Sequence, residues 1–344
     1  MEPREPSPDR GGRRALTVRR PSRLAALAGA AALAALSWRC ADAGGPVPPD
    51  PVEIAAATIT AADMAGWIGA LADDSMLGRQ TPSVGLTWTA LTAQRTFDSA
   101  GLDPLFGSSF EQDYPVPKSV PAEVAPNIGA WRPGSDAALR NEYVLFVAHM
   151  DHIGTGTPVN GDTIYNGADD NASGTSSVLE IAGALGALTT APRRSMIVLL
   201  VSGEEHGFWG SRYFVNVPPV PLGGIVAVIN LDMVSRNNPD SMLVTGMDLS
   251  SMGDAVRAAA VAHPEDHLSL RAGPNGLSDH IPFAEQGRPW LLFFAGLHAD
   301  YHKPSDEPSQ SDPDKAARVA RLAFRTGVAI ANALSPPVLR AAAP

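Results

Sequence analysis

The 344-residue sequence has little cysteine and a deficit of positive charge, with 36 Asp and Glu against 26 Lys and Arg. Its single cysteine, Cys40, has no partner for a disulfide within the chain, and removal of residues 1–43 would leave no thiol nucleophile at all. The same removal takes away eight Arg and four acidic residues, so the formal net charge changes from −10 to −14. Such an acidic chain is not expected to bind nucleic acid or an anionic membrane.

Several hydrolase signatures are also missing. The sequence contains no Gly-x-Ser-x-Gly elbow, no His-Glu-x-x-His pair and no dinucleotide-binding glycine fingerprint. These absences disfavour an α/β-hydrolase serine enzyme, a single-helix zinc protease and a nicotinamide-dependent enzyme.

The first 43 residues are typical of an export signal. Five arginines between residues 13 and 23 precede the apolar stretch Leu24–Leu36, which is short for a membrane span, and Ala41-Asp42-Ala43 forms a small-x-small cleavage site. We expect a signal peptide over residues 1–43 and an exported chain, periplasmic or secreted. An uncleaved N-terminal anchor is the alternative, and paired arginines leave Sec and twin-arginine export both open. A lipoprotein at Cys40 is less favoured, because Trp38 and Arg39 replace the small residues that such a site prefers.

The remaining chain is expected to hold one catalytic domain. Residues 44–59 form a predicted linker, residues 60–336 the domain and residues 337–344 a tail. A helical lead-in starts the domain, with one helix from the capping residue Thr60 to about Leu71 and another over Ser83–Ala100. A turn at Ser75–Arg79 separates the two helices.

From Asn127 onward, apolar strands alternate with helical segments. The predicted strands are Tyr143–Ala148, Met196–Val201, Ile225–Leu231, Met242–Thr245 and Trp290–Ala295. The predicted helices are Asn171–Leu188, Gly207–Val215, Met252–Ala262, His280–Gln286 and Lys315–Leu334. This alternation predicts an α/β fold, with helices on both faces of one sheet. Ligands of such sheets bind outside the carboxyl ends of the strands.

Charged side chains gather at those predicted strand ends. The candidates are two imidazoles and three carboxylates, which suit Zn²⁺: His149, Asp169, Glu205, Asp232 and His302. One ion would have too many ligands, whereas two ions that share one carboxylate would use all five. Asp151 and Asp306 follow the two histidines at spacings that allow them to accept the second imidazole N–H.

The segments that carry these residues resemble the M28 family of zinc-dependent exopeptidases. The matching motifs are Ala148–His152, Asn166–Gly174, Gly203-Glu204-Glu205, Asn230–Met233, Ser278-Asp279-His280 and Asp300–Asp306. The resemblance implies a three-layer α/β/α sandwich with a mixed, mostly parallel central sheet, and two zinc ions per chain. It also implies peptide substrates.

The resemblance carries roles onto single positions. His149 and Asp232 would hold one zinc, Glu205 and His302 the other, and Asp169 would bridge them, with a cis peptide between Asp169 and Asp170. Glu204 would be the general base, and Tyr301 would stabilise the oxyanion. Supporting roles would fall to the carboxylates Asp151, Asp170, Asp279 and Asp306.

Two other functions remain open at this stage. A glutaminyl cyclase shares the fold but uses one zinc, and a binding module could keep the fold without the chemistry. Aminopeptidase rather than carboxypeptidase activity is the expectation from the commonest behaviour of relatives with a short lead-in. The side-chain specificity cannot be predicted from the sequence.

Overall fold

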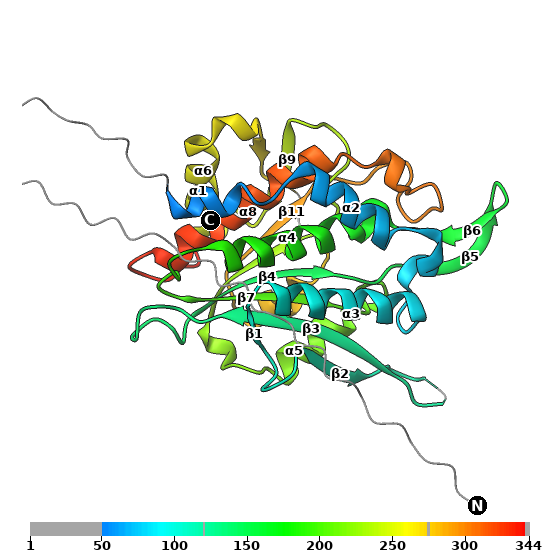
Figure 1. Cartoon of the computed structure of the whole chain (residues 1–344), viewed down its shortest axis with the longest axis horizontal. Helices are drawn as coiled ribbons and strands as arrows, with labels where there is room; N and C mark the ends of the chain where they lie inside the picture. The colour runs from blue at the N-terminus through cyan, green and yellow to red at the C-terminus, as the bar shows by residue number, and fades with distance from the viewer. Residues whose placement is uncertain (1–49, 120, 274–275, 341–344) are drawn as a thin grey trace, which may run out of the picture. The chain divides into compact units, whose positions relative to one another are not determined.

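The computed structural model describes residues 50–119, 121–273 and 276–340 (Figure 1). The predicted signal peptide, residues 44–49 of the predicted linker and the end of the predicted tail lie outside the described residues. Among the described helices, none has the length and apolar character needed to span a bilayer.

Nine strands form one mixed sheet in the order β1-β3-β7-β4-β8-β11-β9-β10. The ninth strand, β2, pairs with residues 124–128 of β3. The neighbours β7, β4, β8 and β11 run parallel, and β3 and β9 flank this group in antiparallel orientation. The strands are β1 (Asp103–Pro104), β2 (Glu111–Pro115), β3 (Val124–Arg132), β4 (Tyr143–His149), β7 (Ser195–Val201), β8 (Ile225–Leu231), β9 (Ser241–Thr245), β10 (Ser269–Arg271) and β11 (Trp290–Phe294). The prediction of a mixed sheet is confirmed, and the parallel strands are its centre.

The central strands are buried on both faces. Alternate residues of β4 point to opposite sides: Val144, Phe146 and Ala148 join the core beneath α3, α4 and α8, whereas Leu145 and Val147 pack with Phe214 and Phe283 of α5 and α7. The helices are α1 (Pro51–Ala56), α2 (Ala61–Leu71), α3 (Val84–Ser99), α4 (Gly174–Ala187), α5 (Trp209–Asn216), α6 (Met252–Ala262), α7 (Ile281–Glu285) and α8 (Pro313–Asn332). The result is a three-layer α/β/α sandwich.

Most predicted elements lie where the sequence placed them, within about three residues. The helix α2 starts where Thr60 accepts a hydrogen bond from the amide of Asp63, as the capping pattern predicted. Several elements were not predicted: β1, β2, β3, β10 and a separate hairpin of β5 (Gly154–Val159) and β6 (Asp162–Tyr165).

The predicted linker is wrong for residues 51–56. These residues form α1, because Asp50 caps its first amides and Pro51 stands at the first helical position, where a proline is tolerated. Ala55 and Ala56 are fully buried against the core. The predicted tail also makes contacts, since the amide of Arg340 donates to the carbonyl of Leu249.

The sheet register sets the position of the functional residues. His149 is the last residue of β4 and is paired with Val201, the last residue of β7. Phe293, near the end of β11, is paired with Leu231, the last residue of β8. The loops that leave these four parallel strands therefore emerge at one edge of the sheet.

Candidate metal centre

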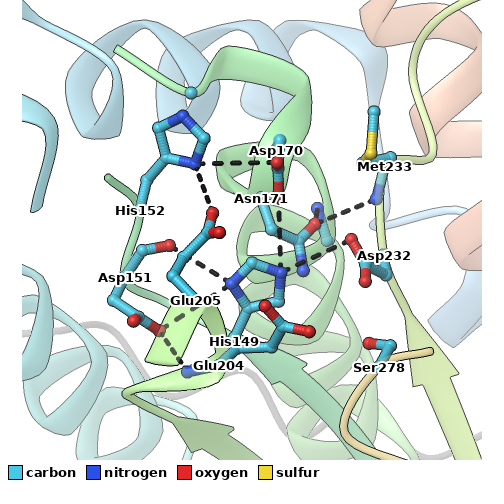
Figure 2. Close-up of polar contacts among 12 residues, drawn as sticks. His149, Asp151, His152, Asp170, Asn171, Glu204, Glu205, Asp232, Met233 and Ser278 are labelled. Atoms are coloured by element: carbon cyan, nitrogen blue, oxygen red, sulfur yellow. Dashed lines mark hydrogen bonds and ion pairs between the residues drawn. The ribbon is translucent and has the colours of Figure 1, made fainter. Parts of the chain in front are cut away.

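Two groups of metal-type donors share one carboxylate at this edge (Figure 2). His149, Asp170 and Asp232 form the first group, and His152, Asp170 and Glu205 the second. In the first group, Nε2 of His149 lies 3.5 Å from Oδ1 of Asp170 and 3.4 Å from Oδ1 of Asp232. The other oxygen of Asp170 faces the second group, so this side chain stands between the two.

His302 also belongs to the second group. Its Nε2 lies 3.2 Å from Oδ2 of Asp170 and 3.2 Å from Oε2 of Glu205. Two donors on one tetrahedral zinc, each about 2.0 to 2.2 Å from the ion, lie about 3.3 to 3.6 Å apart. The His149 separations, 3.5 and 3.4 Å, fall within this range, and those of His302, both 3.2 Å, lie just below it.

His152 has a different geometry. Its Nδ1 lies 2.8 Å from Oε1 of Glu205, which is a hydrogen-bond distance, and 3.7 Å from Oδ2 of Asp170. This fully buried imidazole therefore orients Glu205 through Oε1, whereas His302 faces Oε2. The sequence analysis included His152 in a motif but gave it no role; its position directly after Asp151 was the available signal.

The predicted bridging residue, Asp169, does not lie between the two groups. Its Oδ1 accepts hydrogen bonds from the amide and hydroxyl of Ser235, at 2.8 and 2.7 Å, and from the hydroxyl of Ser173. Its Oδ2 lies 3.4 Å from Nε2 of His298. Successive side chains of this irregular turn point in different directions, and it is Asp170 that faces the cluster.

The cis peptide is also one residue later than predicted. It joins Asp170 to Asn171, not Asp169 to Asp170. The side-chain oxygen of Asn171 accepts hydrogen bonds from the amides of Gly174 and Met233, so the turn is tied to the start of α4 and to the loop after β8.

The other predicted supporting carboxylates differ in their contacts. Asp151 lies beside His149, with Oδ1 at 3.8 Å from Nδ1, and its main-chain oxygen is nearer to that nitrogen, at 3.2 Å. Asp306 does not contact His302. Its carboxylate instead accepts the amides of Asp169 and Asp170, at 3.0 to 3.2 Å, so it holds the turn that presents Asp170.

Asp279 belongs to neither donor group. It is fully buried and accepts a hydrogen bond of 2.6 Å from the hydroxyl of Ser211 in α5. Burial raises the pKa of Asp279 to about 7, while His149 and the Ser211 hydrogen bond act in the opposite direction.

The adjacent residues Glu204 and Glu205 have opposite electrostatics. Burial raises the pKa of Glu204, and the nearby carboxylates Asp279 and Asp232 add to that effect. Burial alone would raise the pKa of Glu205 too, but its hydrogen bonds with His152 and His302 hold that pKa well below its usual range. The surroundings thus favour the charged form of Glu205 and the protonated form of Glu204.

A cavity of about 370 Å³ opens on the first donor group. Glu204 and Tyr301 line it beside the donors, and the Tyr301 ring stacks on the imidazole of His302 at 3.8 Å between ring centres. The rest of the wall is mostly apolar: Met233, Gly276, Leu277, Leu292, Phe294 and Leu297. The described lining includes no Lys or Arg.

The donor set fits zinc. It contains imidazole nitrogens and carboxylate oxygens at the spacing of a tetrahedral ion, and Oδ2 of Asp170 and Oδ1 of Asp232 are buried without a well-formed hydrogen bond from any described residue. A bound cation would stabilise such a cluster of buried carboxylates. The fold and the donor set therefore indicate a metal-binding protein of the three-layer α/β/α class.

Comparison with known proteins agrees with this class. The model of peptidase family M28 matches residues 127–326, more than half of the chain. The chain belongs to peptidase family M28. It is 34% identical over 177 residues to aminopeptidase YwaD of Bacillus subtilis; the match covers 48% of this chain and 36% of that relative. The chain thus spans about a third of the length of the curated relatives that it matches.

Two solved structures illustrate the range of this fold. A zinc aminopeptidase from Bacillus subtilis, BSAP, is 25% identical and superimposes with a TM-score of 0.50, over 59% of this chain and 49% of that one. A glutaminyl cyclase from Porphyromonas gingivalis is 19% identical, with a TM-score of 0.64 over 78% and 97% of the two chains. The second likeness shows the fold alone.

Proposed function

We propose that this chain is a zinc aminopeptidase that removes N-terminal residues from peptides. The observation that carries the proposal is the position of the buried Asp170 carboxylate. Its Oδ1 faces His149 and its Oδ2 faces His302. Two zinc ions would then use five protein residues: His149 and Asp232 for one ion, Glu205 and His302 for the other, and Asp170 for both.

Bound zinc would polarise the substrate carbonyl and lower the pKa of a water molecule. Glu204 lines the same cavity and would accept a proton from that water, then return it to the departing amine. The hydroxyl of Tyr301 would donate a hydrogen bond to the oxygen of the attacked carbonyl. Asp151 would keep the His149 ring in the tautomer that leaves Nε2 free.

The charge of the cavity favours a free amino terminus over a free carboxylate. The described lining residues include no Lys or Arg that could pair with a free carboxylate of the substrate, which disfavours a carboxypeptidase. The apolar wall offers burial to the first side chain of the substrate. We therefore assign large aliphatic N-terminal residues as the favoured substrates.

The test uses purified zinc-loaded protein with four substrates: Leu-p-nitroanilide, its N-acetyl derivative, a peptide with a blocked N-terminus and free C-terminal Leu, and Gln-β-naphthylamide. Cleavage of the first substrate with at least 100-fold slower cleavage of the blocked ones supports the proposal. Preferential release of C-terminal Leu identifies a carboxypeptidase. Cyclisation of the Gln substrate without hydrolysis identifies a cyclase and contradicts the proposal.

Export of the chain is proposed from residues 1–43, whose arginines, apolar stretch and Ala41-Asp42-Ala43 site support cleavage after Ala43. N-terminal sequencing of protein recovered from the periplasm or medium tests this directly. A mature chain that starts near Gly44 supports cleavage, and an intact N-terminus contradicts it.

A further inference from the structure

The turn that precedes α3 reaches deep into the metal centre. This segment, residues 74–82, lies outside the family-matched region 127–326 and is called the lead-in turn below. Leu77, Gly78 and Arg79 all have positive φ angles, of 48°, 66° and 51°. A Cβ on Gly78 would lie 2.4 Å from the carbonyl oxygen of Tyr165 and 2.5 Å from that of Gly154, so only glycine allows this approach.

Arg79 extends from this turn into the interior. Its side chain is one of the largest fully buried side chains among the described residues. Four main-chain carbonyls accept hydrogen bonds from its guanidinium: Met150 at 3.2 Å, Leu71 at 2.5 Å, Asn166 at 2.8 Å and Gly167 at 2.9 Å. In the opposite direction, the amide of His152 donates to the carbonyl of Arg79, at 3.4 Å.

These carbonyls belong to the two loops that carry proposed zinc ligands. Met150 stands between His149 and Asp151, at the end of β4. Asn166 and Gly167 come directly before the turn that presents Asp170. One planar cation therefore joins the loop of the first imidazole to the loop of the shared carboxylate.

A neighbour extends the contact to a third loop. The hydroxyl of Thr81 accepts a hydrogen bond of 3.1 Å from the amide of Gly203, directly before Glu204. Thr81 also hydrogen-bonds the carboxylate of Asp151, which lowers the pKa of that group against the larger effect of burial. The lead-in turn thus contacts the loops that follow β4, β6 and β7.

Arg79 also brings positive charge beneath the acidic cluster. Burial lowers the pKa of Arg79, and the carboxylates of Asp170 and Asp151 partly offset this effect. The resulting pKa is about 10, so the guanidinium is charged at neutral pH. Its hydrogen bonds go to neutral carbonyls, which leaves the charge to act on the carboxylates through space. That charge reduces repulsion among them while zinc is absent.

We propose that Arg79 is a positioning residue of the metal centre: it fixes the loops of His149 and Asp170 at zinc-binding separation and offsets the charge of the carboxylates. The proposal rests on the zinc site described under the proposed function. It also makes the lead-in turn part of the catalytic unit.

The experiment compares Arg79→Met, Arg79→Lys and Arg194→Met with the wild type in the full chain. Arg194 is a matched control, because it is fully buried and donates to the carbonyls of Ile330 and Ala333 and to Glu142, at the opposite ends of the strands. Zinc affinity is measured by competition with a chromophoric chelator. The melting temperature is measured with and without zinc, and kcat and KM are measured at saturating zinc.

We expect Arg79→Met to weaken zinc binding about 10- to 100-fold, the range typical for residues that orient metal ligands. Arg79→Lys keeps the positive charge but loses the planar guanidinium that donates to several carbonyls at once. The zinc affinity of this variant should therefore fall between those of Arg79→Met and the wild type. Arg194→Met should lower the melting temperature but leave zinc affinity within twofold of the wild type.

Unchanged zinc affinity in a folded Arg79→Met variant would overturn the proposal and leave Arg79 a structural residue. If Arg79→Met does not fold, Arg79→Lys decides: wild-type affinity in that variant contradicts the proposal, and reduced affinity supports it. A wild-type chain that binds no zinc would instead refute the proposed function. The two failures are therefore distinct.

Discussion

Asp169 and Asp170 are adjacent in sequence, but their carboxylates lie in separate environments. Oδ1 of Asp170 is 3.5 Å from Nε2 of His149, whereas Oδ1 of Asp169 is 2.7 Å from the hydroxyl of Ser235. One carboxylate faces the metal-type donors, and the other ties the turn to the loop after β8.

This difference predicts opposite results for two conservative substitutions. Asp170→Asn removes the charge of the shared carboxylate and should weaken zinc binding by more than about 100-fold. This loss exceeds that expected for residues that only hydrogen-bond a metal ligand. Asp169→Asn keeps an acceptor oxygen for Ser235 and should retain bound zinc. Elemental analysis after dialysis measures both. Zinc loss in Asp169→Asn with full retention in Asp170→Asn would reverse the assignment.

A second pair of variants separates the two histidines of the second group. His302→Ala should lose one zinc, because its Nε2 stands at ligand spacing from Asp170 and Glu205. His152→Gln removes the imidazole that orients Glu205 and should weaken zinc binding only about 10- to 100-fold. Zinc per chain and affinity are measured in parallel. A larger loss in His152→Gln than in His302→Ala would make His152 the ligand.

The strand ends could be predicted because short apolar runs rich in aromatic and β-branched residues, such as Tyr143–Ala148, are typical of a buried strand. The choice between Asp169 and Asp170 could not, since both are carboxylates in one turn and the distinction depends on backbone geometry. The strand β3 was not predicted, because Pro126, Asn127 and Gly129 interrupt its apolar pattern. The turn at Arg79 was predicted, but three of the four carbonyls that accept hydrogen bonds from its guanidinium lie 71 to 88 positions further along the chain.

Glu204→Gln should separate catalysis from metal binding. The amide cannot accept the proton, so kcat should fall by about 10² to 10⁴, the usual contribution of a general base. Zinc content should stay at the wild-type level, since Glu204 belongs to neither donor group. Stopped assays with Leu-p-nitroanilide and elemental analysis test both statements. Wild-type turnover in a zinc-loaded variant would exclude Glu204 as the base.

Chelation should destabilise the folded chain. A ligand that binds only the folded state at 100 times its dissociation constant stabilises it by about 2.7 kcal/mol. Excess EDTA should therefore lower the melting temperature by about 4 °C for a chain of this size. Zinc should restore it and magnesium should not, because the donor set contains imidazoles.

Asp170→Asn, measured beside the wild type, should show a much smaller response to EDTA. An EDTA response equal to that of the wild type would mean that Asp170 does not hold the metal.

The apolar wall of the cavity predicts a specificity change in Leu297→Asp. Leu297 is 62% exposed, so the substitution should leave folding intact while it places a charge beside the first side chain of the substrate. The ratio of kcat/KM for Leu- and Lys-p-nitroanilide should fall at least about 10-fold, comparable to the loss of one or two apolar contacts in a pocket. Leu339→Asp, on another exposed leucine outside the cavity lining, serves as the control and should leave the ratio unchanged. Equal ratios in both variants would place the substrate side chain away from this wall.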